Sequence, residues 1–254
     1  MFNLKKLFSK APSGNTEATF KDLRRHERIS LSPSLDAFLT LEGLPKLVLS
    51  DLSYGGTQAI VGGADASTLK QLVEKHQISG KITLLRDVYP IVLKISYIGD
   101  RAAGFCFIHE DPTFLLALRG VIEPLRWGQS LFAIPKDIAA DRYKGDAWFC
   151  YRGDGPVDLV IKSESPGVIS EFLMVFRRGK DYLEISWQHT KLRTSQNKEP
   201  NATGVSYSSA AQMVSTDELD QATIRMALWL ISGMNTGVCP LQKALIERIL
   251  PECK

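Results

Sequence analysis

The chain has 254 residues, of which 44% are hydrophobic and 23% charged, and its formal net charge is +3. These proportions are typical of an ordinary globular protein and argue against disordered, collagenous and membrane-spanning classes. The charge is too small for a general DNA- or RNA-binding protein, which carries a broad basic face, so a site for an anion must be local. The length slightly favours two domains over one.

The four cysteines are widely scattered, and no pair has the spacing of a zinc site or a disulfide framework. We interpret them as reduced thiols of a cytoplasmic protein and expect no metal. The first ten residues alternate apolar side chains with lysines but contain no long apolar run, so we expect neither a signal peptide nor a transmembrane segment. They could touch an anionic membrane weakly, although a frayed tail is the simpler interpretation.

Residues 1–19 are predicted to be a flexible segment, and 20–127 a first domain built from short strands. We predict strands at 35–41, 46–50, 57–61, 81–85, 90–98 and 102–108, with a helical excursion at 65–75. Apolar side chains recur at every second position of 90–98, as a half-buried strand requires. Short strands separated by turn signals favour an antiparallel meander or barrel over βαβ units.

Asp111 and Pro112 form a helix start, with proline at the first helical position, and the helix is predicted to run to about Trp127 and close the barrel. Residues 128–254 are predicted to form a second domain. After a connector, we predict strands at 147–151, 157–162, 169–177 and 182–188, with a weaker strand near Lys191. Helices follow in the prediction at 216–234 and 241–250, after a mobile polar loop at 194–203.

The predicted fold class is therefore mainly β with α+β. An antiparallel barrel with a flanking helix is followed by a small antiparallel sheet with two helices. We expect the second domain to act as an output or interaction domain.

A cluster of arginines precedes the first predicted strand, at Arg24, Arg25 and Arg28. Arg24 and Arg28 lie four positions apart, which in a helix or curled loop directs both guanidinium groups toward one ligand. The donors of a guanidinium match phosphate oxygens and the O6/N7 edge of guanine in pairs. This cluster alone is also explained by a solvated run of charge.

A second segment follows the second predicted strand, from Asp51 to Gly56, and is predicted to be a turn. Asp51 and Ser53 lie two positions apart, so in an extended segment they point the same way. A carboxylate can accept hydrogen bonds from N1–H and N2–H₂ of guanine, and Ser53 can bond backbone or phosphate. Gly55 and Gly56 permit a positive φ and a close backbone approach.

In order and spacing, the two segments resemble the PilZ domain family, whose hallmarks are an RxxxR loop before the first barrel strand and a (D/N)xSxxG turn after the second. The strands predicted around 95–99 and 104–107 resemble the last two strands of that family. The resemblance covers about 20–127 and implies a six-stranded antiparallel barrel that binds the bacterial second messenger cyclic di-GMP. The implied ligand-binding residues are Arg24, Arg28, Asp51, Ser53 and Gly56, to which we add Arg25 and Gly55 from within the motifs.

Many members of the family have another arginine directly before RxxxR, where this chain has Leu23. With one guanidinium fewer, a second, stacked cyclic di-GMP is harder to support. We therefore predict one ligand for each domain.

The resulting hypothesis is a cyclic di-GMP receptor that relays its signal to a protein partner in motility, biofilm, pilus or secretion control. The alternative is a PilZ-like adaptor that acts without nucleotide. We do not expect an enzyme or a cofactor. The four histidines show no pairing at metal spacing, and the sequence has neither a nucleophile elbow nor a phosphate-binding glycine loop.

Overall fold

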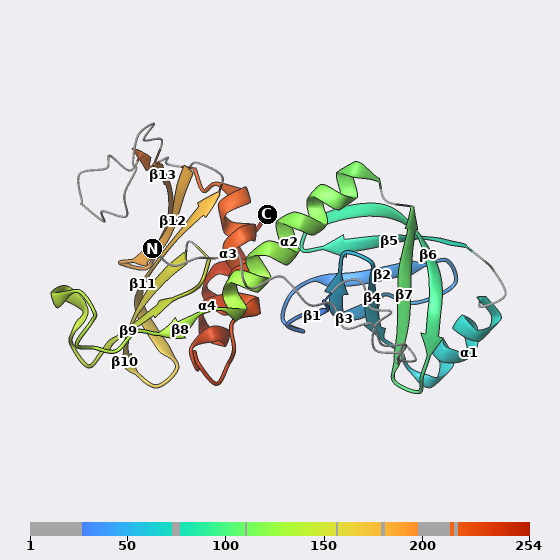
Figure 1. Cartoon of the computed structure of the whole chain (residues 1–254), viewed down its shortest axis with the longest axis horizontal. Helices are drawn as coiled ribbons and strands as arrows, with labels where there is room; N and C mark the ends of the chain where they lie inside the picture. The colour runs from blue at the N-terminus through green and yellow to red at the C-terminus, as the bar shows by residue number, and fades with distance from the viewer. Residues whose placement is uncertain are drawn as a thin grey trace, which may run out of the picture.

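The computed structural model describes residues 27–72, 77–109, 111–155, 157–178, 181–197, 214–215 and 218–254. Two seven-stranded antiparallel sheets lie at opposite ends of the molecule. The long helix at 112–129 and the C-terminal helices lie between them (Figure 1). The fold is thus mainly β with α+β, as predicted. The segment 1–19 lies outside the described residues. None of the described helices is long and apolar enough to cross a bilayer.

The first sheet closes into a barrel. Its strands are β1 (Ile29–Ser30), β2 (Ala37–Leu41), β3 (Leu47–Ser53), β4 (Gly56–Ile60), β5 (Ile78–Leu84), β6 (Asp87–Ile98) and β7 (Ala102–His109). Their order is β1-β3-β2-β5-β6-β7-β4, and β3 also pairs with β4, which closes six strands. The predicted six-stranded antiparallel barrel is confirmed, and β1 pairs with β3 as a seventh strand outside the closure.

Alternation of apolar residues explains the barrel core. In β2, every second side chain is buried, and the same periodicity recurs over much of β3 and β6. Leu39, Ile82, Leu93 and Phe105 are fully buried inside the barrel. Helix α1 (Gly63–Leu72) lies between β4 and β5 in the chain, close to the predicted helical excursion. Inward apolar side chains therefore fix which face of each strand points to the core.

Helix α2 (Pro112–Gln129) begins where the sequence predicts. Asp111 caps it by accepting a hydrogen bond from the Thr113 backbone N–H at 2.9 Å, which satisfies one of the free donors of the first turn. Its buried face contacts the barrel at β1 and β3 and continues onto the helices of the second half. The helix therefore connects the two sheets physically.

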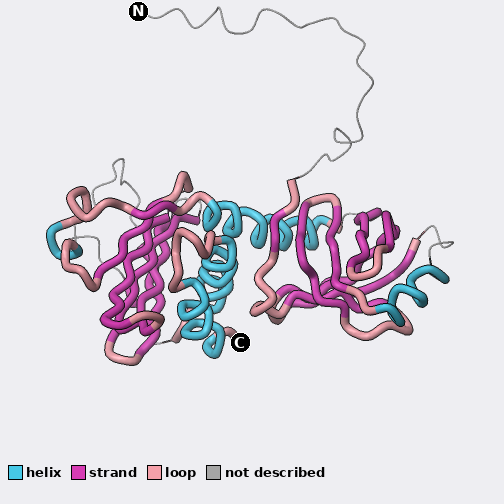
Figure 2. The backbone as a smooth tube through the Cα atoms, turned by 90° about the horizontal axis from the view of Figure 1, so that it is seen from below, coloured by secondary structure: helices cyan, strands magenta, loops and turns pink. Residues whose placement is uncertain are grey.

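The second sheet is a meander. Its strands are β8 (Phe132–Ala133), β9 (Trp148–Arg152), β10 (Val157–Ser165), β11 (Val168–Arg178), β12 (Asp181–Gln188), β13 (Lys191–Asn197) and β14 (Val214–Ser215), in reverse sequence order. Helices α3 (Gln221–Gly233) and α4 (Gln242–Ile249) lie against the face that is turned toward the barrel (Figure 2). Short 3₁₀ helices are at Asp141–Tyr143 and Leu250–Glu252. The small antiparallel sheet with two helices is confirmed.

Two predictions near β13 are wrong. Thr194 was predicted to lie in a mobile loop, but it lies in β13 opposite Ile185, and its hydroxyl accepts a hydrogen bond from the Asp220 backbone N–H at 2.8 Å. Helix α3 begins at Gln221, not at residue 216, because Asp220 caps it through hydrogen bonds from Ala222 and Thr223. Residues 198–203 of the predicted loop lie outside the described residues.

Two glycines allow α2 and α3 to cross in close contact. A Cβ atom built at Gly128 would overlap the carbonyl oxygen of Leu230, and one built at Gly233 would overlap the carbonyl oxygen of Leu125. The two helix backbones therefore touch directly. Buried side chains of the barrel, the helices and the second sheet also form one connected cluster. A domain boundary at Trp127 stays a prediction.

Glu184 is a partly buried carboxyl group in β12, between Val175 of β11 and Ser195 of β13. Burial raises the pKa of Glu184 above the ordinary value for glutamate, because desolvation disfavours the charged form. The folded chain then holds this proton to a higher pH than the unfolded chain, so stability falls as the pH rises through the interval between the two pKa values.

Glu184→Gln is therefore expected to be more stable than the wild type at pH 7, with the advantage shrinking toward about pH 4. Urea unfolding at the two pH values measures this difference. Glu42→Gln, at an exposed turn, is the control and should change stability little at either pH. An equal or lower stability of Glu184→Gln at pH 7 contradicts the prediction.

Candidate functional site

The two sequence motifs meet at the edge of the barrel. Arg28 directly precedes β1, Asp51 lies in β3, and the register of these strands places Ser30 opposite Asp51. Arg28 Nη1 donates to Asp51 Oδ1 at 3.2 Å and to Oδ2 at 3.3 Å. Residues 23 apart in sequence are thus joined by an ion pair. Arg24 and Arg25 lie outside the described residues.

Strand β4 holds Asp51 from the other side. The Gln58 backbone N–H donates to Asp51 Oδ1 at 3.0 Å, and the buried Thr57 hydroxyl donates to the Asp51 carbonyl oxygen at 2.6 Å. Sequence reasoning missed Thr57 and Gln58. The β3–β4 hairpin register, which places Gln58 opposite Asp51, is the signal that could have found them. Asp51 is therefore oriented before any ligand binds.

The turn between the strands is shorter than predicted. Asp51 and Ser53 belong to β3, Gly56 opens β4, and Tyr54 and Gly55 make the turn. Ser53 is buried, and its hydroxyl donates to the Gly56 carbonyl oxygen at 3.0 Å. In this structure Ser53 stabilises the hairpin, and its hydroxyl is directed at the turn backbone.

Gly56 is required for space and not for its φ angle. Among the described glycines, φ is positive at Gly43 and Gly167, so the positive φ that Gly55 and Gly56 would permit is not used. A Cβ atom at Gly56 would overlap the carbonyl oxygen of Phe105 in the neighbouring strand β7. The backbones of β4 and β7 therefore lie very close together at this glycine.

Gly56→Ala is expected to destabilise the barrel by about 1–3 kcal/mol, because the added methyl group meets a strand backbone that cannot move alone. Urea unfolding followed by circular dichroism measures the loss. The control is Gly120→Ala, an exposed helical position where a Cβ atom would meet nothing within 4 Å. A Gly56→Ala protein as stable as the wild type would show that β4 and β7 are not packed as described.

The arginine segment is also connected to α2. Glu27 Oε2 lies 3.4 Å from Arg126 Nη2, and both side chains are exposed. The pair joins the residue next to Arg28 to the helix that packs on α3. Sequence reasoning missed this contact, because it depends on how α2 lies across the barrel. The site is therefore linked to the second half of the chain.

The geometry suits recognition of a phosphate together with a hydrogen-bond-donating base. The Arg28 and Asp51 side chains keep 25% and 16% of their surface exposed, so both remain accessible at the barrel edge. Arg28 bonds Asp51 through Nη1, and a guanidinium group has further donors at Nε and Nη2 that can bind an anion. The described residues contain no group of histidine, cysteine and carboxylate side chains that could hold a metal ion.

The protein is a closed antiparallel β-barrel with an arginine–aspartate site at its edge. Helix α2 joins this barrel to a second antiparallel sheet. No protein-family model matches the chain, and no curated protein matches it. Among solved structures, the chain is similar to PlzA of Borreliella burgdorferi, which was crystallised in complex with c-di-GMP. The sequences are 14% identical, the TM-score is 0.31, and the match covers 69% of this chain and 83% of PlzA.

Proposed function

We propose that this protein is a PilZ-type receptor for cyclic di-GMP, acting in the bacterial cytoplasm as a signalling protein and not as an enzyme. The observation that carries the proposal is the contact between Arg28 and Asp51, which joins the two sequence motifs in one place. If the RxxxR run and the DxSxxG turn were unrelated chance matches, contact between them would not be expected.

The residues divide the recognition of the ligand between them. The arginines, Arg28 together with Arg24 and Arg25, would bind the phosphates through charge-assisted, two-pronged hydrogen bonds. The Asp51 carboxylate would accept from N1–H and N2–H₂ of one guanine base. Ser53 and Gly56 contribute indirectly, because they fix the hairpin that positions Asp51.

The contacts of the arginine segment support a relay to the second half. Bound phosphates would neutralise the mutual repulsion of the arginines and favour one arrangement of this segment, as a ligand shifts a population of conformations. Glu27 contacts Arg126 of α2, and α2 packs against α3. A change at the site therefore has a direct path to a protein partner on the second half, in motility, biofilm, pilus or secretion control.

A thermal-shift experiment tests the proposal. Cyclic di-GMP, cyclic di-AMP and GMP are each added to the wild type and to the Arg28→Ala protein. A ligand present at one hundred times its dissociation constant stabilises the folded state by about 2.7 kcal/mol. We expect cyclic di-GMP, and neither of the other two nucleotides, to raise the melting temperature of the wild type. None of the three should raise the melting temperature of the Arg28→Ala protein. No shift with any nucleotide would support the adaptor alternative.

A further inference from the structure

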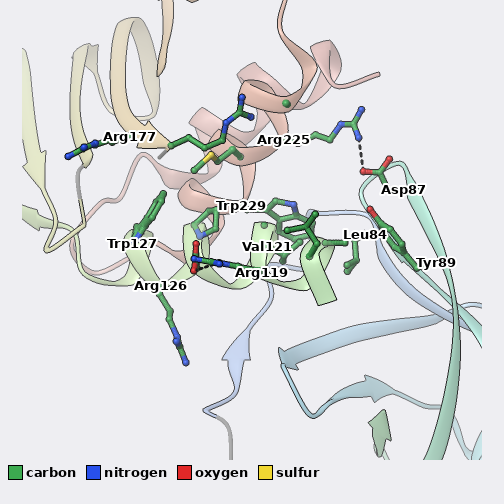
Figure 3. A pocket seen from close by; sticks show the side chains of 18 residues that line it. Leu84, Asp87, Tyr89, Arg119, Val121, Arg126, Trp127, Arg177, Arg225 and Trp229 are labelled. Atoms are coloured by element: carbon green, nitrogen blue, oxygen red, sulfur yellow. Dashed lines mark hydrogen bonds and ion pairs between the residues drawn. The ribbon is translucent and has the colours of Figure 1, made fainter. Parts of the chain in front are cut away.

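A groove of about 1100 Å³ lies between the barrel, α2, α3 and the end of β11. Figure 3 shows its labelled side chains coming from all of these elements. We call it the arginine groove, because five arginines line it: Arg119, Arg126, Arg177, Arg178 and Arg225. It lies apart from Asp51, which is not among its lining residues.

The arginine groove concentrates positive charge. Against its five arginines the lining has two carboxylates, Asp87 and Glu123, so its formal charge of +3 equals that of the whole chain. Asp87 pairs with Arg225 at 2.6 Å, and Glu123 pairs with Arg119 at 2.7 Å. Arg126 also pairs with Glu27, which lies outside the lining. Arginines of α2, α3 and β11 therefore line the groove from several sides. A surface of this kind attracts a partner of negative charge.

The groove exposes both aliphatic and aromatic side chains. Trp229 is almost fully buried, whereas Tyr89 and Trp127 are partly exposed. Leu116 is 70% exposed at the edge, and Met226 is partly exposed on α3. The small net charge of the whole chain argues against a nucleic-acid partner, whereas apolar side chains with arginines beside them suit an amphipathic helix.

We infer that the arginine groove binds an acidic amphipathic segment of a partner protein. Apolar side chains of this segment lie on Leu116 and Met226. Its carboxylates pair with Arg178 and compete with Glu123 for Arg119. The inference names a partner class that the proposed nucleotide function leaves open, and it does not require that cyclic di-GMP binds.

The test uses the full chain and two fluorescent helical peptides of about 15 residues, which span about 22 Å. One has leucines on one face and glutamates beside them, and the other has lysines in place of the glutamates. The charge-reversal protein is R119E/R178E, which changes two exposed groove residues. Its matched control is R101E/R193E, with two exposed arginines outside the groove. Circular dichroism and thermal melting check that both proteins fold.

Fluorescence anisotropy is expected to show binding of the glutamate peptide and not of the lysine peptide. R119E/R178E should weaken binding about tenfold or more, R101E/R193E should leave it within about twofold, and more salt should weaken it. No binding of the glutamate peptide, or equal losses in both variants, overturns the inference. A single-stranded oligonucleotide that binds more tightly than the peptide, and loses binding in R119E/R178E, also overturns it.

The same proteins separate this inference from the proposed function. Arg28→Ala should bind the glutamate peptide as the wild type does, and R119E/R178E should still bind cyclic di-GMP. A wild type that binds the peptide without binding cyclic di-GMP would contradict the receptor function alone. Binding of cyclic di-GMP without the peptide would contradict the groove alone.

Discussion

Gly128→Ala and Gly233→Ala are each expected to destabilise the protein by about 3 kcal/mol, at the upper end of the cost of overpacking a close contact. Each added methyl group would overlap a backbone carbonyl of the other helix. A backbone cannot turn aside as a side chain can, so α2 and α3 must separate and lose packing around them. Urea unfolding, followed by tryptophan fluorescence, to which Trp127 and Trp229 near this crossing contribute, measures the loss.

Gly120→Ala is the matched control, because it lies in the same helix with open space around it. Alanine is the better helix former, so this variant should be more stable than the wild type by about 0.5–1 kcal/mol. If Gly128→Ala unfolds at the same urea concentration as Gly120→Ala, the backbone contact between α2 and α3 is wrong.

Arg28→Ala is expected to weaken cyclic di-GMP binding about a hundredfold or more, since it removes several charge-assisted hydrogen bonds to phosphate and releases Asp51. Arg28→Lys keeps the positive charge but loses the planar guanidinium group. Its affinity for cyclic di-GMP should lie between those of the wild type and of Arg28→Ala. The fold should survive, because the Arg28–Asp51 pair is partly exposed and such pairs contribute about 1 kcal/mol or less. Arg24→Ala is expected to behave in the same way.

A nucleotide titration of each variant, with melting temperature as the check on folding, measures this effect. Arg101→Ala removes an exposed arginine in the turn between β6 and β7 and should leave affinity unchanged. Unchanged affinity in both Arg28→Ala and Arg24→Ala would refute the site.

Much of the fold follows from local signals. The period-two pattern of β6 and the Asp111 cap of α2 are both found at the predicted places. Strand β1 has only two residues, too few for a pattern. The start of α3 was misplaced because the contact that holds its cap, Asp220, comes from Thr194, 26 residues earlier in the chain. The α2–α3 crossing depends on Gly128 and Gly233. From the sequence alone, a glycine inside a helix indicates only that the helix is less stable.

The sequence predicted which residues of the candidate site meet, but not how the neighbouring strands hold them. Motif order predicted that Arg28 and Asp51 would share one site, and the structure places them in contact. The hydrogen bonds from Thr57 and Gln58 to Asp51 depend on the exact register of β3 and β4. The Glu27–Arg126 contact depends on tertiary packing. Neither is encoded in local periodicity. Ser53 shows that a motif residue can act on the backbone beside it.

Isothermal titration calorimetry of the wild type with cyclic di-GMP tests the central claim most directly. We predict saturable binding with one molecule for each chain, and a larger number for Leu23→Arg, which restores the arginine that precedes RxxxR in many PilZ domains. A stoichiometry near two for the wild type would contradict the limit set by Leu23. The absence of saturable binding by the folded protein would contradict the receptor function itself.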